Sequence, residues 1–242
     1  MLSETRWLGI WNARKTIRFM LKTIIFDFDG TIGNTQQIIL RSMQATIKEL
    51  ALPARTDLQC AAMIGLPLTQ CFTNLYPDYP ETVVDAVKGE QCAATYRRLF
   101  DEFNEKGAVP LFPHVLETIQ TLHRQGIEIT IASSRSHQTL DAYVRDLQLG
   151  DYIHYILGVE DVQDAKPGPG PVLKTLRDLG RLPEECIVVG DTKYDIQMAH
   201  NAGVKAVGVT YGNGSREEME EENTEWIIDD FAQMIDVCKS LI

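Results

Sequence analysis

The chain has 242 residues, of which 44% are hydrophobic and 24% are charged, and its formal net charge is −11 at pH 7. This composition excludes a wholly disordered chain, and no apolar run approaches the roughly 20 residues that a transmembrane helix requires. The acidic balance argues against a nucleic-acid partner, because a phosphate backbone binds a basic face. A small anionic ligand stays compatible with it, because a bound metal ion reverses the sign of the local field.

Two features of the sequence concern its N-terminal segment and the cellular location of the protein. Residues 1–19 carry four basic side chains against one acidic side chain, and Met20 directly precedes the first apolar run. We interpret 1–19 as a leader, either an extension from a mis-assigned start or a loosely packed tail. The chain has five cysteines and no CxxC pair, which predicts buried, reduced thiols and a cytoplasmic location.

Short apolar runs alternate with helical patterns along the rest of the chain. Strands are predicted at residues 23–28, 128–132, 155–159, 186–189 and 205–209, with an edge strand at 226–228. Helices that end at a glycine are predicted over 115–122, 140–147 and 172–179. This alternation predicts an α/β fold with a Rossmann-like, three-layer core and a mostly parallel sheet.

The first two predicted strands are separated by about 100 residues, far more than the dozen or so that one crossover needs. Most of this segment has helical periodicity. One apolar stripe includes Ile39 and Met43, and a second includes Val87 and Phe100. We therefore expect an inserted helical cap at 35–105, within an α/β core formed by residues 20–34 and 106–242.

The strongest local motif is the run Asp27-Phe28-Asp29-Gly30-Thr31 at the end of the first predicted strand. In an extended chain, Asp27 and Asp29 point to the same side, about 6–7 Å apart. The glycine that follows permits a sharp turn. Ligands of open parallel sheets bind at the carboxyl ends of strands, which favours a site here over a simple Asp-Gly turn.

A second pair of carboxylates, Asp191 and Asp195, follows the fourth predicted strand. Asp191 or Thr192 could also cap the next helix, a role that is compatible with ligand binding. Carboxylates that converge at one edge of a sheet repel one another unless a cation lies among them. Oxygen ligands of this kind are those that Mg²⁺ prefers.

Hydroxyl groups and one cation complete the predicted site. Ser133 and Ser134 follow the second predicted strand, and one serine of this segment, which also contains Ser136, is expected to cap the next helix. Lys166 lies in a proline-rich loop between the third and fourth predicted strands. The topology brings it to the same edge of the sheet, where an ammonium group could bind an anion.

The order of these motifs resembles the haloacid dehalogenase superfamily of phosphohydrolases. A helical insertion directly after the first motif is similar to its branch of phosphoglycolate phosphatases and β-phosphoglucomutases. The resemblance covers about residues 21–230, and it implies an Mg²⁺-dependent phosphatase that hydrolyses a small phosphorylated metabolite.

The resemblance also implies a role for each motif residue. Asp27 would attack phosphorus to form an aspartyl-phosphate, and Asp29 would protonate the leaving group and then activate water. Mg²⁺ would be held by Asp27, the Asp29 carbonyl group, Asp191 and Asp195. The phosphoryl group would be bound by Gly30, Thr31, Ser133, Ser134 and Lys166, of which Ser133 and Lys166 join Asp27 and Asp29 in the catalytic set.

Individual residues separate the members of this superfamily. Dehalogenases lack the second acid, so Asp29 favours phosphoryl chemistry. Mutases of the β-phosphoglucomutase type usually carry histidine where this chain has Ile39, which disfavours a sugar-phosphate mutase but keeps it as an alternative. Ser133-Ser134-Arg135 replaces the Thr-Asn-Lys common in phosphoglycolate phosphatases, so the substrate stays open.

Three points are left open by the sequence. A phospho-accepting signalling or binding protein also combines clustered Asp residues, a hydroxyl group and a Lys, although such receiver domains are shorter and lack the insertion. Loops 65–67 and 211–214 could each approach the site or form a plain kink or turn. The oligomeric state is not predicted.

Overall fold

The computed structural model describes residues 21–77, 84, 86–105 and 109–241, so the predicted leader 1–19 lies outside the described residues. A six-stranded sheet forms the centre of the fold, with the strand order β3-β2-β1-β4-β5-β6. Its strands, all parallel to their neighbours, are β1 (Thr23–Phe26), β2 (Glu128–Ala132), β3 (Ile153–Leu157), β4 (Cys186–Gly190), β5 (Lys205–Val209) and β6 (Trp226–Ile228).

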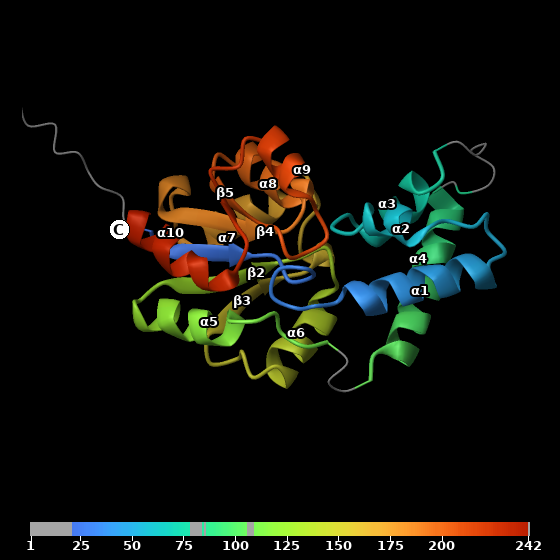
Figure 1. Ribbon diagram of the computed structural model, residues 1–242, viewed down its shortest axis with the longest axis horizontal. Coiled ribbons are helices and arrows are strands. Elements are labelled where there is room, and N and C mark those ends of the chain that lie inside the picture. The colour runs from blue at the N-terminus through green and yellow to red at the C-terminus, as the bar shows by residue number, and fades with distance from the viewer. Residues whose placement is uncertain (1–20, 78–83, 85, 106–108, 242) are drawn as a thin grey trace, which may run out of the picture.

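Helices cover both faces of the sheet, which confirms the three-layer α/β prediction (Figure 1). Side chains alternate between the faces of a strand, so Ile24 and Phe26 of β1 pack on one face and Ile25 on the other. The first face is covered by α5 (Val115–Arg124), α6 (His137–Asp146) and α10 (Met234–Leu241). The second face is covered by α7 (Gly170–Leu179) and α8 (Lys193–Asn201).

Four helices between β1 and β2 lie together beside the sheet, at the right of Figure 1. They are α1 (Gln36–Glu49), α2 (Asp57–Ala61), α3 (Leu68–Asn74) and α4 (Ala86–Phe103). We call residues 36–103 the helical insertion. α4 packs against both α1 and α3, and Ile39, Met43 and Phe100 are buried as their spacing predicted.

Val87 does not belong to the apolar stripe of α4, although its spacing placed it there. Its side chain is 80% exposed. Gly89 faces α3 instead, because a Cβ atom at this position would lie 3.0 Å from Cγ2 of Thr73. Residues two positions apart on a helix point in nearly opposite directions, so Val87 faces away from α3.

Two strands end earlier than their apolar runs predicted. β1 stops at Phe26, because the Phe28 carbonyl oxygen already accepts the hydrogen bonds of a turn. β3 begins at Ile153 and ends at Leu157, two residues before the predicted bounds. Beyond it, the Val159 N–H group donates to the carbonyl oxygen of Arg135 and leaves the sheet ladder.

Two other expectations from the sequence, the edge strand and the buried cysteines, are confirmed. β6 forms the edge of the sheet, and all five cysteines are free and buried. Near the C-terminus, a run of glutamates around Met219 lies in α9 (Arg216–Glu221), which buries Met219 and leaves most of its glutamates exposed. Within the described ranges, none of the helices has the length and apolar character needed to cross a membrane.

Candidate active site

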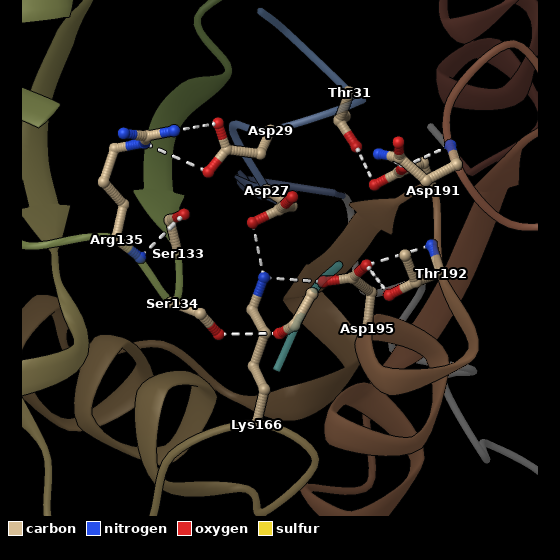
Figure 2. Close-up of polar contacts among 12 residues, drawn as sticks. Asp27, Asp29, Thr31, Ser133, Ser134, Arg135, Lys166, Asp191, Thr192 and Asp195 are labelled. Atoms are coloured by element: carbon tan, nitrogen blue, oxygen red, sulfur yellow. Dashed lines mark hydrogen bonds and ion pairs between the residues drawn. The ribbon is translucent and has the colours of Figure 1, made fainter. Parts of the chain in front are cut away.

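The loops that follow β1, β2 and β4 lie side by side at one edge of the sheet, which we call the sheet rim (Figure 2). β1 pairs with β2 on one side and with β4 on the other, so the three carboxyl ends point the same way. The rim gathers Asp27, Ser133 and Asp191, and Lys166 reaches it from the loop before α7. Parallel strands place their following loops at one edge, as the sequence argument required.

The turn after β1 depends on a glycine. The Phe28 carbonyl oxygen accepts hydrogen bonds from the backbone N–H groups of Thr31 and Gly33. Gly30 has a φ angle of +87°, which residues with a side chain rarely adopt. A Cβ atom at Gly30 would also overlap the carboxylate of Asp191. Glycine at this position therefore allows the loops after β1 and β4 to approach each other more closely than any other residue would.

Four charged side chains meet in the interior of the rim. Lys166 is 2% exposed, Asp27 is 4% exposed, and Asp191 and Asp195 are fully buried. The Lys166 ammonium nitrogen lies 2.5 Å from Oδ1 of Asp27 and 2.6 Å from Oδ1 of Asp195. Charges this deeply buried are tolerated only when they are paired and hydrogen-bonded. The four side chains must therefore keep the positions in which they contact one another.

Burial and mutual repulsion change the acidity of these groups. Burial raises the pKa of Asp27 to about 7, against the lowering effect of Lys166, while Asp195 and Asp29 raise it further. Burial also raises the pKa of Asp191 well above its ordinary value, and Asp195 and Asp27 add to the rise. Burial alone would lower the pKa of Lys166, but Asp195 and Asp27 raise it, so the ammonium stays charged.

The donor set of the rim fits a hard divalent cation. One carboxylate oxygen from each of Asp27, Asp191 and Asp195 lies within 4.8 Å of the others. Lys166 supplies one positive charge against these three groups, so ionising all of them in a buried place needs a further cation. Beside them, the Asn213 side-chain oxygen is buried without a hydrogen-bond partner among the described residues. Oxygen ligands of this type suit Mg²⁺.

Asp195 also fixes the start of α8. Its Oδ2 atom accepts hydrogen bonds from the Thr192 backbone nitrogen at 3.1 Å and from the Thr192 hydroxyl group at 2.8 Å. Thr192 occupies the N-cap position, one of the two candidates for this role, and the helix begins at Lys193. Capping and cluster formation are thus combined, since the other oxygen of Asp195 binds Lys166.

The loop after β5 reaches the rim, which decides between the two interpretations of 211–214. The Asn213 backbone nitrogen and Nδ2 donate to Oδ2 of Asp191 at 2.7 and 2.8 Å. The Thr31 hydroxyl group donates to the other Asp191 oxygen at 3.3 Å. The Tyr211 hydroxyl group donates to the Thr31 carbonyl oxygen at 3.0 Å, which ties the same loop to the turn after β1.

The serines after β2 have three different surroundings. Ser133 is buried at the strand tip, and its oxygen accepts a hydrogen bond from the Arg135 backbone nitrogen at 3.3 Å. Ser134 donates to the Gly65 carbonyl oxygen at 2.7 Å, which joins the rim to the helical insertion. Ser136 is the N-cap of α6, as one serine was expected to be. Loop 65–67 therefore contacts the rim and is more than a kink between helices.

Asp29 has a partner that the sequence argument missed. Arg135 binds it with two donors, Nη2 to Oδ1 at 2.7 Å and Nε to Oδ2 at 3.1 Å. Burial would lower the pKa of Arg135, but Asp29 raises it above its ordinary value. The sequence did contain a signal, because an arginine stands where phosphoglycolate phosphatases commonly carry a lysine, but its partner lies 106 residues away.

A cavity of about 620 Å³ separates the rim from the helical insertion. Asp27 and Asp29 line its floor together with the serines after β2. The opposite wall combines apolar side chains such as Met43 and Leu66 with the charged groups of α4. A cavity of this size suits a small molecule whose anionic end meets the rim and whose other end meets the insertion.

Comparisons with known proteins agree with this arrangement. A model of haloacid dehalogenase-like hydrolases matches residues 24–209. The chain belongs to this family. The pyrophosphatase PpaX of Halalkalibacterium halodurans is 31% identical over 90% of this chain and 96% of its own length.

Solved structures share the fold of this hydrolase. A haloacid dehalogenase-like hydrolase from Bacteroides fragilis is similar with a TM-score of 0.81 and 28% identity, over 88% of this chain and 99% of that chain. A predicted phosphoglycolate phosphatase from Haemophilus somnus has a TM-score of 0.78 and 24% identity, over 90% and 97%. The resemblance inferred from the motifs is therefore confirmed, and the protein is an enzyme of this hydrolase family.

Proposed function

We propose that this hydrolase is an Mg²⁺-dependent phosphatase that removes the phosphoryl group from a small phosphate monoester. The observation that carries the proposal is the buried contact of Lys166 with both Asp27 and Asp195, next to a cavity that Asp27 lines. A nucleophilic carboxylate and an anionic phosphoryl group repel each other. A fixed cation at their meeting point offsets that repulsion and stabilises charge that builds up during transfer.

Asp27 is the nucleophile of the proposed reaction. Its carboxylate attacks phosphorus, forming an oxygen–phosphorus bond while the bond from phosphorus to the leaving oxygen breaks. The product is an aspartyl-phosphate, which splits one difficult substitution into two easier steps. The burial that raises the pKa of Asp27 also removes water from its oxygens, and Lys166 keeps the ionised form available.

Asp29 transfers the protons of both steps. It gives a proton to the leaving oxygen in the first step. In the second step it takes a proton from the water that attacks phosphorus, while the bond from phosphorus to the Asp27 oxygen breaks and inorganic phosphate leaves. It lines the cavity two residues beyond Asp27. General acid and base catalysis of this kind contributes typically about 10²–10⁴-fold to a rate.

The metal would be held by the Asp27 carboxylate, the Asp29 carbonyl group and Asp191, with Asp195 beside them. When bound, Mg²⁺ neutralises charge on the nucleophile and the phosphoryl oxygens. Asn213 and Thr31 hold the two oxygens of Asp191 and so orient this ligand. The shared oxygen chemistry of the donor set supports this assignment.

The phosphoryl oxygens would be bound by groups at the strand tips. We assign this role to Gly30 and Thr31 of the turn after β1, the Ser133 hydroxyl group and the Lys166 ammonium group. Ser134 joins this set if its hydroxyl group exchanges the Gly65 carbonyl oxygen for substrate. Such donors stabilise the transition state when they are already in place before the reaction.

In this proposal residues 35–105, which include the helical insertion, form a cap, and residues 20–34 and 106–242 form the core. The cap covers the cavity, excludes bulk water and contacts the leaving group. The free, buried cysteines support a reducing location such as the cytoplasm. The substrate is a small phosphorylated metabolite.

A second candidate substrate is pyrophosphate, because the relative from Halalkalibacterium halodurans is named a pyrophosphatase. The cavity wall contributed by α4 carries Glu90 and Asp101 against Arg97, so a second phosphate group would meet more negative than positive charge there. This balance favours a monoester with an uncharged leaving group. A sugar-phosphate mutase stays the alternative activity, with Ile39 standing against it.

The decisive experiment measures release of p-nitrophenol from p-nitrophenyl phosphate with and without Mg²⁺. We expect turnover that requires the metal and falls by at least about 10³-fold in Asp27→Asn. Asp236→Asn, at a carboxylate that is 80% exposed on α10, is the matched control and should keep full activity. Lack of turnover with any divalent metal would favour a signalling or binding protein instead.

The same protein is then tested on a panel of phosphoglycolate, sugar phosphates, nucleotides and pyrophosphate. Release of inorganic phosphate identifies the preferred substrate. Transfer of the phosphoryl group to a second hydroxyl group instead of water would establish the mutase alternative. Preference for pyrophosphate over every monoester would overturn the assignment of an uncharged leaving group.

A further inference from the structure

Arg135 reaches across the sheet rim from the loop after β2 to Asp29 (Figure 2). The two side chains are 10% and 16% exposed, so water competes little for their contact. The guanidinium group uses two donors, one for each carboxylate oxygen, at 2.7 and 3.1 Å. This fork fixes both oxygens in one plane, whereas the single ammonium group of a lysine would leave the carboxylate free to rotate.

Two aromatic rings hold the guanidinium group from different parts of the fold. Cζ of Arg135 lies 4.6 Å from the centre of the Phe100 ring and 5.3 Å from the centre of the Tyr143 ring. Phe100 belongs to α4 of the helical insertion, and Tyr143 belongs to α6, where it stacks on Phe28. Planar guanidinium groups are attracted to ring faces. Arg135 is therefore held between the insertion and the core.

The backbone of Arg135 is fixed as well. Its nitrogen donates to Oγ of Ser133 at 3.3 Å, and its carbonyl oxygen accepts from the Val159 nitrogen at 2.9 Å. The side chain thus starts from a rigid point at the end of β2. Because two hydrogen bonds hold the Arg135 backbone, a change in the position of the Phe100 ring acts on the guanidinium group.

We propose that Arg135 is a positioning residue that orients the Asp29 carboxylate for proton transfer, and that Phe100 makes this orientation depend on the position of the helical insertion. The inference rests on the proposed function, in which Asp29 acts as acid and then as base. A carboxylate offers about four lone-pair sites, and the fork occupies one on each oxygen. The remaining sites are not used by Arg135, and both side chains line the cavity.

Orientation decides the rate of this step because proton transfer needs a donor and an acceptor within about 2.6–3.2 Å. A freely rotating carboxylate would meet this condition only part of the time. The coupling through Phe100 gives the insertion a second task besides covering the cavity. When α4 is in place, the Phe100 ring covers one side of the Arg135 guanidinium group, and both donors of that group stay on Asp29.

The alternative role for Arg135 is a direct contact with the phosphoryl group. Both roles place a cation near the reaction, but they affect different kinetic quantities. Loss of a phosphate ligand weakens binding of every phosphorylated compound alike. Loss of an orienting group slows turnover of substrates whose leaving oxygen needs a proton. It has little effect on substrates whose leaving group departs as a stable anion.

The test compares Arg135→Met and Arg135→Lys with the unmodified protein on p-nitrophenyl phosphate and on an alkyl phosphate. We expect Arg135→Met to lower kcat/KM about 10²-fold for the alkyl phosphate and less than about 10-fold for p-nitrophenyl phosphate. Arg135→Lys restores the charge without the fork, so it should recover part of the alkyl-phosphate activity. Phe100→Leu should reproduce the substrate dependence of Arg135→Met in weaker form.

Two further measurements keep the result interpretable. Binding of inorganic phosphate to Arg135→Met should match that of the unmodified protein, and a loss of about 10-fold or more would establish a phosphate ligand and overturn the proposal. Arg98→Met removes an exposed cation of α4, the helix that carries Phe100, and should leave the substrate ratio unchanged. If Arg135→Met does not fold, Arg135→Lys and Phe100→Leu decide the matter.

The two proposals fail in different ways. An unmodified protein that turns over no phosphorylated compound would remove the proposed function. An active protein whose Arg135 variants lose the same factor on both substrates would overturn the positioning role alone.

Discussion

The sheet rim and the helical insertion face the same cavity, but they are stabilised differently. The rim buries charged groups and pairs them with one another, as in the contacts of Lys166 with Asp27 and Asp195. The insertion buries apolar side chains such as Phe72 and leaves its ion pair between Arg98 and Glu49 about half exposed. Buried ion pairs tolerate one geometry, whereas apolar packing tolerates substitutions of similar volume.

This difference assigns separate tasks to the two regions. Substitutions at the rim groups that meet the phosphoryl group or the metal should affect every substrate, because the chemistry at phosphorus is shared. Apart from Phe100, which contacts Arg135, substitutions at the cavity wall of the insertion should change the preference among substrates and leave the chemical step in place.

Removing the cation of the rim should have the largest effect. Lys166→Met leaves the buried carboxylates of Asp27 and Asp195 without their partner. Breaking a buried ion pair costs about 3–5 kcal/mol of unfolding free energy, and activity on every substrate should fall by about 10³-fold or more. Urea unfolding and phosphate release measure the two quantities. Lys174→Met, in an ion pair on the exposed side of α7, should have a much smaller effect on both.

The turn after β1 gives the second prediction. Gly30 and Gly180 both have left-handed backbone angles, +87° and +61°, but a Cβ atom would meet Asp191 at the first and no neighbour within 4 Å at the second. Gly180→Ala should therefore lose about 1 kcal/mol of stability and keep its activity, whereas Gly30→Ala should lose more stability and about 10²-fold in activity. Equal effects of the two substitutions would show that the close approach to Asp191 has no functional consequence.

The cavity wall of the insertion gives the third prediction. Met43 is 2% exposed and lines the cavity from α1. Met43→Ala should change the ratio of kcat/KM between two monoesters by about 10-fold, because one missing apolar contact is worth that much discrimination. Its kcat on p-nitrophenyl phosphate should stay within about threefold of the unmodified value. A uniform loss on all substrates would contradict the division of tasks.

The smallest effect concerns a surface histidine outside both regions. The hydrogen bond with Asp161, at 2.6 Å, raises the pKa of His137 above its ordinary value. The folded protein then favours the charged ring, so this stabilisation is complete below about pH 6.5 and is lost as the pH rises through the raised pKa. Because the ring is partly exposed, solvent screening limits the contribution to a few tenths of a kcal/mol, roughly.

The comparison of unfolding free energies between the unmodified protein and His137→Gln checks this sign. Their difference should be greatest at pH 6 and should shrink toward pH 9. A difference that grows with pH would contradict the assignment of a raised pKa.

The sequence was sufficient for the features that depend on local pattern. Apolar runs predicted the strands, and the motifs at Asp27 and Asp191 predicted the rim, because parallel strands bring their carboxyl ends together whatever the side chains are. The family model and the strand order confirm the fold class. The buried cysteines followed from their apolar surroundings.

Other features depend on which distant residues meet, and no local pattern encodes that. The contact of Arg135 with Asp29 joins residues 106 positions apart, and Ser134 bonds to Gly65 across 69 positions. Val87 had helical spacing, but the close packing of Gly89 against α3 turned it to solvent. Periodicity identifies a helix, and the partner of the helix decides which face is buried.

The central claim is that Asp27 carries the phosphoryl group during the reaction. The most direct measurement quenches the protein in acid during turnover, digests it and locates the phosphorylated peptide by mass spectrometry. The claim predicts one phosphoryl group on the peptide that contains Asp27, absent from Asp27→Asn. A phosphoryl group on a different residue, or turnover without any phosphorylated protein in the quenched samples, would contradict it.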